Sequence, residues 1–213
     1  MVLFAFVLFA FLQTSFPLPA PTPTNNPAAD FFKEVPLKPM QDLKEKHLKE
    51  DTGFQAAVVY FKSPEWAQMI EDVRKNPAWI EYKKFLNDNA IDIEFVIKHL
   101  EHCLNATDTK DFKVEKIKPS IGKFVEDVRA TYSVLILQAA QTYLAKESNT
   151  DTYRNFVAKM QSEESRKILE KALGEAPMKK VASKLKEMDF NLENLLELYY
   201  SIFGWRPYYK FSA

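Results

Sequence analysis

Residues 54–104 have the sequence FQAAVVYFKSPEWAQMIEDVRKNPAWIEYKKFLNDNAIDIEFVIKHLEHCL, and residues 153–203 have the sequence YRNFVAKMQSEESRKILEKALGEAPMKKVASKLKEMDFNLENLLELYYSIF. The two stretches align without a gap at an offset of 99 residues, and apolar positions stay apolar throughout. Identical pairs include Ser63 and Ser162, Glu65 and Glu164, and Leu86 and Leu185. A fixed period of this kind is typical of repeat architectures, so we predict two copies of one structural unit.

Helix-capping residues recur at matching places in both copies. Ser63 and Asn76 each precede a proline, whose missing N–H costs nothing at the first helical position. Ser162 is followed by Glu163, and Asn191 is followed by Leu192 and Glu193; an acid in the first turn favours the positive end of a helix dipole. The expected helices cover residues 39–50, 54–62, 64–75, 77–88 and 92–103 in the first copy, and 134–147, 152–161, 163–173, 177–188 and 192–203 in the second.

Each copy is expected to begin with one more helix. Phe31–Val35 matches Phe124–Val128, although the second copy is about six residues longer before the alignment resumes. Gly174 and Gly204 are suited to helix C-terminal stops. With four glycines against 17 phenylalanines and nine tyrosines, the composition favours packed helices over Gly-rich phosphate loops or many-turned sheets. The predicted fold class is therefore all-α, with two tandem repeats of about five to six short helices.

The amino terminus predicts export from the cell. Met1–Leu12 is an unbroken apolar run that is too short to span a bilayer as a helix, and a Pro-rich stretch follows it. We expect a signal peptide over residues 1–20, cleaved near Ser15 or Ala20, and hence a secreted protein; a membrane anchor is the minor alternative. The remaining predicted segments are a Pro-rich linker at 21–29, a first repeat at 28–104, a linker at 105–117, a second repeat at 118–206 and an aromatic tail at 207–213.

Two further features bear on secretion and on partners. Asn105-Ala-Thr107 is an N-glycosylation acceptor in a polar stretch, so Asn105 is a candidate glycosylation site. Cys103 is the one cysteine and cannot form an internal disulfide, so the core alone must stabilise the chain. Lys plus Arg and Asp plus Glu are equal at 29 each, and this balance argues against nucleic acid as a partner.

Two of the expected helical segments are apolar nearly all round. Residues 54–61 and 134–144 present apolar side chains on almost every face, so such helices must be buried on two sides. They could be the central helices of a solid bundle, or helices with one side against their neighbours and the other facing an apolar cavity. Periodicity does not separate these alternatives.

Three stretches carry a resemblance to a known family: Phe54–Trp66, Ile121–Val128 and Leu185–Gly204. Together they resemble the insect allergen-related repeat family, which includes the group 1 cockroach allergens, insect midgut microvillar proteins and the nitrile-specifier proteins of some caterpillars. The resemblance covers nearly the whole mature chain. The aromatic segment Trp205–Phe211 departs from the family pattern.

The resemblance implies a capsule of short helices around one apolar cavity that holds fatty acids, phospholipids or similar amphiphiles, in a protein secreted into the insect gut lumen. A nitrile-specifier-like detoxification activity, or a structural helical repeat protein of the gut surface, are the alternatives. The candidate lining residues repeat in register at helical spacing: Val58, Phe61, Val96, Leu100, Val157, Leu195, Leu196 and Tyr199.

The sequence does not offer a recognisable catalytic constellation, and no cofactor is expected. His47 lies in the charged run Lys44–Glu50, which is typical of an exposed helix face. Paired acids such as Glu163 and Glu164 are at a predicted helix start, where solvated capping is their usual role.

His99, His102 and Cys103 have a spacing that could hold a metal on one helix face, but we predict that they do not. Their counterparts at the 99-residue offset are Leu198, Ser201 and Ile202, so Cys103 occupies an aliphatic position of the repeat. Metal analysis of the purified protein should find no stoichiometric zinc or iron. Bound metal that is lost in His99→Ala would show this prediction to be wrong.

Overall fold

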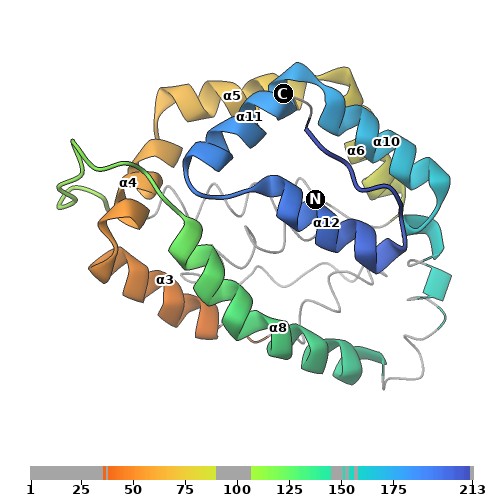
Figure 1. Cartoon of the computed structure of the whole chain (residues 1–213), viewed down its shortest axis with the longest axis horizontal. Helices are drawn as coiled ribbons and strands as arrows, with labels where there is room; N and C mark the ends of the chain where they lie inside the picture. The colour runs from red at the N-terminus through yellow and green to blue at the C-terminus, as the bar shows by residue number, and fades with distance from the viewer. Residues whose placement is uncertain are drawn as a thin grey trace.

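The computed structural model of the chain describes residues 36, 38–89, 107–144 and 158–211, together with positions 151, 154 and 155. In these ranges the chain is helical and contains no strand, as the predicted all-α class requires. The helices, labelled as in Figure 1, are α3 (Lys38–Glu50), α4 (Thr52–Phe61), α5 (Pro64–Lys75), α6 (Pro77–Asp88), α8 (Gly122–Leu144), α10 (Glu163–Gly174), α11 (Ala176–Glu187) and α12 (Leu192–Phe203).

The helices begin where the sequence places capping side chains. Ser63 Oγ accepts a hydrogen bond from the backbone N–H of Trp66, and Ser162 Oγ does the same for Ser165. Asn76 Oδ1 accepts from the N–H groups of Ala78 and Trp79 at the start of α6. These contacts satisfy backbone donors that the first turn of a helix leaves without partners.

The helix bounds follow the 99-residue offset. Moving α5 by 99 positions gives residues 163–174, the bounds of α10, and moving α6 gives residues 176–187, the bounds of α11. The described positions between 151 and 160 are helical, as α4 at the same offset requires. The predicted helix at 92–103 lies outside the described residues.

The beginning of the second repeat was predicted incorrectly. Instead of a first helix followed by a second one at 134–147, the structure has the single 23-residue helix α8 from Gly122 to Leu144. No proline or further glycine interrupts this segment, so the chain has no reason to stop a helix near residue 134.

The two repeats pack against each other with approximate twofold symmetry. Helix α5 packs against α11 and α6 packs against α10, so each contact is the counterpart of the other under the offset (Figure 1). At the centre, Asn76 Nδ2 donates a hydrogen bond of 3.0 Å to Glu175 Oε2. These two residues are themselves counterparts, and a residue touches its own counterpart only close to a symmetry axis.

One apolar core extends through both repeats. Its buried members come from α4, α5 and α6 in the first repeat and from α8, α10, α11 and α12 in the second, while Leu43 and Leu48 of α3 pack against it. The largest fully buried side chains include Phe54, Tyr82 and Tyr200. None of the helices within the described ranges is long and apolar enough to cross a membrane.

The aromatic tail folds back along the second repeat. Trp205 is buried, packs edge-on against Tyr200 at 5.3 Å between ring centroids, and donates its Nε1–H to the carbonyl of Gln161. Further along, the backbone N–H of Phe211 donates to Glu193 Oε1 at the start of α12. The tail therefore runs antiparallel to α12 and is part of the packed second repeat.

Gly204 and Gly174 provide a matched test of the helix ends. Gly204 follows α12 with φ of +72°, in the left-handed region, whereas Gly174 is the last residue of α10 and does not have a positive φ. A Cβ at Gly204 would meet no atom within 4 Å, so Gly204→Ala should cause no clash. We expect it to lower the unfolding free energy by about 1 kcal/mol, because alanine is strained at this positive φ. Gly174→Ala should be neutral or slightly stabilising. Chemical denaturation measures both, and equal effects would contradict the assignment.

Candidate functional site

Four of the predicted cavity-lining residues have described side chains, and all four belong to the apolar core or pack against it. Val58 and Leu196 are buried, with exposed fractions of 4% and 1%. Phe61 and Leu195 are half-buried and pack against the same cluster. The structure therefore brings residues of both repeats into one apolar interior.

The other predicted site residues lie outside the described part of the chain. These are Val96, Leu100, Val157, the side chain of Tyr199, the candidate glycosylation site Asn105, and the residues His99, His102 and Cys103.

The helices that are apolar on all faces are not buried on all faces. In α4, Phe54, Ala57 and Val58 enter the core, but Val59 is 36% exposed. In α8, Phe124 and Val128 are buried, whereas Val134 is 58% exposed. The expectation that such helices must be buried on two sides is wrong at these positions, because α4 and α8 each leave part of their apolar surface at the outside of the packed helices.

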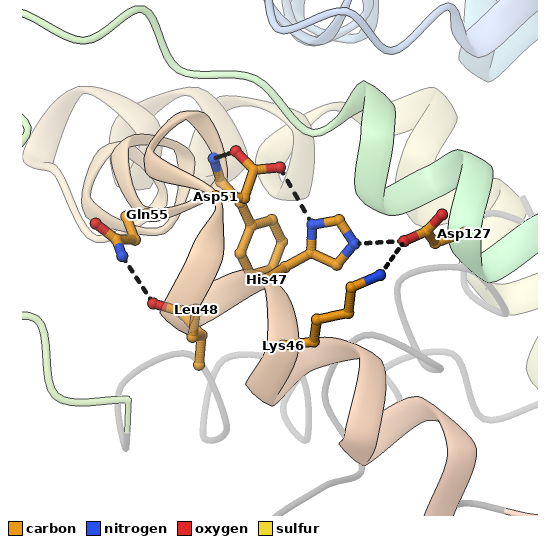
Figure 2. Close-up of polar contacts among 7 residues, drawn as sticks. Lys46, His47, Leu48, Asp51, Gln55 and Asp127 are labelled. Atoms are coloured by element: carbon orange, nitrogen blue, oxygen red, sulfur yellow. Dashed lines mark hydrogen bonds and ion pairs between the residues drawn. The ribbon is translucent and has the colours of Figure 1, made fainter.

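A polar cluster in the described structure centres on His47, on α3. Its Nδ1 lies 3.1 Å from Asp51 Oδ2 and its Nε2 lies 3.0 Å from Asp127 Oδ2, as Figure 2 shows. The other oxygen of Asp51 accepts from the backbone N–H of Phe54 and so caps α4. Lys46 Nζ lies 3.3 Å from Asp127 Oδ2. This His47 bridge joins α3, the start of α4 and α8.

The imidazole of His47 has little contact with water. It is 2% exposed and packs edge-on against the rings of Phe54 and Phe124, which stack on each other at 4.8 Å. An ionised carboxylate has no proton to donate, so both contacts are hydrogen bonds only when each ring nitrogen carries one. The hydrogen bond with His47 is the main cause that lowers the pKa of Asp127.

The sequence interpretation of His47 as part of an exposed helix face is wrong. His47 is four residues after Leu43 and four before Asp51, so it lies on the same helix face as both. Leu43 and Leu48 pack against the core, and this apolar pair, one just before the charged run and one within it, is the signal that could have located the buried face.

Both nitrogens of His47 are in contact with carboxylates of the same chain. Among the described residues, no group of three His, Cys, Asp or Glu side chains could hold a metal ion. Because the contacts of His47 join α3, the start of α4 and α8, the bridge acts as a clamp between these helices.

A second polar network anchors the tail. Tyr200 donates its hydroxyl hydrogen to Glu170 Oε1 at 2.8 Å, and Arg166 Nε donates to the same oxygen at 2.9 Å. Burial is the first cause that raises the pKa of Tyr200, and the bond to Glu170 is the second. Arg166 also donates to the backbone carbonyl of Arg206. These groups are all used in holding the tail against α10 and α12.

The core of the described residues is thus largely apolar, and the clusters around His47 and Glu170 make their hydrogen bonds within the protein. A family model described as insect allergen related repeat, nitrile-specifier detoxification, matches residues 27–196. The chain belongs to this family. No curated protein and no solved structure matches the chain significantly. The match covers the first predicted repeat and most of the second, and it ends within α12.

Replacing His47 should reveal the clamp. In His47→Leu, two carboxylates lose their shared donor, and we expect the unfolding free energy to fall by about 1–3 kcal/mol, because Asp51 and Asp127 retain some water contact. Lys46→Met removes only the exposed ion pair and should cost about 0.5 kcal/mol or less. Urea denaturation of the two variants tests this, and a His47→Leu protein as stable as the parent would refute it.

Acid stability should depend on Asp127. Because its pKa is lowered in the folded protein, the unfolded chain takes up the proton first as pH falls. The contribution of Asp127 is full above the unfolded pKa of about 3.9 and is lost as the pH falls through the lower folded value. The parent should therefore lose stability more steeply than Asp127→Asn below about pH 4. Superimposable acid denaturation profiles would contradict this.

Proposed function

We propose that this chain is a secreted carrier that sequesters fatty acids, phospholipids or similar amphiphiles in an apolar interior shared by its two repeats. The supporting observation is that Val58 of the first repeat and Leu196 of the second are buried in one continuous apolar core. Membership of the insect allergen-related repeat family supports the same proposal.

The driving force would be the burial of acyl chain surface, about 0.8 kcal/mol per methylene. Aliphatic and aromatic walls offer few directional hydrogen bonds, so the carrier would discriminate by size and shape more than by headgroup. The polar clusters around His47 and Glu170 are consumed by contacts within the protein. This favours binding over the nitrile-specifier-like activity suggested by the family description.

The direct test is solvent extraction of the purified full-length chain followed by mass spectrometry. The proposal expects acyl lipids in a near-stoichiometric amount, and expects the extracted protein to take up added oleate. A control protein purified from the same host should yield only traces. A folded chain that contains no extractable lipid and binds no oleate would rule out the carrier function.

A matched pair of substitutions separates a cavity wall from a solid core. Val58 is a candidate lining residue, whereas Val73 of α5 is buried in the core and is not. If Val58 faces a cavity, Val58→Phe should fold with nearly parental stability and bind less oleate. Val73→Phe should lose about 1–3 kcal/mol through overpacking. Equal destabilisation with unchanged oleate capacity would indicate a solid bundle.

A further inference from the structure

The two repeats carry different types of residue at equivalent positions of the surface between them. We call this surface the inter-repeat interface: α5 and α6 of the first repeat, α10 and α11 of the second, and residues 60 and 159 that precede them. Because α5 and α10 are counterparts, as are α6 and α11, the packing of α6 on α10 is equivalent to the packing of α11 on α5 with the two repeats exchanged (Figure 1).

The first such pair of contacts joins a ring to an amine. Lys184 Nζ lies 4.7 Å from the ring centroid of Tyr60, and Lys159 Nζ lies 5.5 Å from that of Phe85. At the offset of 99, Lys159 is the counterpart of Tyr60 and Lys184 is the counterpart of Phe85. The same cation–π contact therefore occurs twice, with both rings supplied by the first repeat and both amines by the second.

The surroundings of these contacts confirm that the positions are equivalent. Tyr60 donates its hydroxyl hydrogen to Glu65 at 3.1 Å, and Lys159 donates to Glu164 at 2.7 Å. Glu65 and Glu164 are also counterparts. The residue at this position thus binds the same neighbouring acid in both repeats, although its chemical type differs.

A second set of positions differs between the two repeats in the sign of its charge. Lys171 on α10 pairs with Glu81 on α6 at 2.6 Å. Their counterparts are Asp72 on α5 and Lys180 on α11, two helices that also pack together. Again the first repeat supplies the acids at both positions and the second supplies the lysines.

Pairing of like repeats would lose all of this complementarity. Two copies of the second repeat would place Lys159 against Lys184 and Lys171 against Lys180, and Glu175 would meet a second Glu175 on the axis. Two copies of the first repeat would place Asp72 against Glu81. Like charges at such contacts are unfavourable. These residue types therefore favour the pairing of unlike repeats over the pairing of like repeats.

We propose that the inter-repeat interface is selective for an unlike repeat: the acidic and aromatic surface of the first repeat pairs with the lysine-bearing surface of the second in preference to a like surface. This preference favours closure of the chain on itself over association of two copies through like repeats.

The test exchanges counterpart residues in the full-length chain. Glu81→Lys gives the first repeat the residue type of the second, and Lys171→Asp does the reverse. Each single change places like charges together, and we expect each to lower the folding equilibrium constant roughly twofold to fivefold. The double variant restores an opposite pair with inverted polarity, so it should regain most of the loss. Raising the salt concentration to 1 M should shrink this coupling.

A second cycle uses the aromatic positions, and a control uses an exposed lysine. Tyr60→Lys places two amines together and should destabilise, and adding Lys184→Phe should recover the loss, because the ring and the amine have then exchanged places. Combining Glu81→Lys with Lys186→Glu, at an exposed lysine of α11, should give additive effects. If both double variants show the plain sum of their single effects, the interface does not discriminate between repeats and the proposal is wrong.

Discussion

Most of the described helices of this protein are too short to be stable alone, and the rest of the structure depends on that constraint. Helices α5, α6, α10, α11 and α12 have 12 residues each, near the lower limit at which even favourable sequences are marginally helical in water. Their stability must come from packing of their apolar faces. The contacts between α5 and α11 and between α6 and α10 supply that packing, and they join the two repeats into one core.

This constraint also explains where the polar side chains lie. The His47 bridge, the Asn76–Glu175 contact on the symmetry axis and the Glu170 network each connect different helices or hold the tail. Each uses its donors and acceptors within the protein, and the core that surrounds these contacts is formed mostly by apolar residues.

Much of the fold could be predicted from the sequence, because the residues that cap a helix lie next to it in the chain. Ser63 and Asn76 before prolines define α5 and α6, and the 99-residue offset transfers these bounds to α10 and α11. The continuous helix α8 was missed because its alignment with the first repeat suggested a break between two helices. The sequence contains no residue there that would end a helix.

The site was less predictable, because it depends on contacts between segments that are far apart in sequence. His47 contacts Asp127, which lies 80 positions later in the chain, and no residue near His47 indicates that partner. The folding of the tail onto α12 likewise depends on contacts with Gln161 and Glu193. The sequence shows which repeat carries the acids, rings and lysines of the inter-repeat interface. Which of these residues face each other is known only once the packing of the helices is known.

The central claim is that one amphiphile contacts both repeats from inside. The most direct measurement is an isotope-filtered nuclear Overhauser spectrum of the full-length chain with ¹³C-labelled oleate. The account predicts contacts from the acyl methylenes to the methyl groups of both Val58 and Leu196. Contacts confined to exposed side chains such as Ile80 and Val134, which are 48% and 58% exposed, would contradict it.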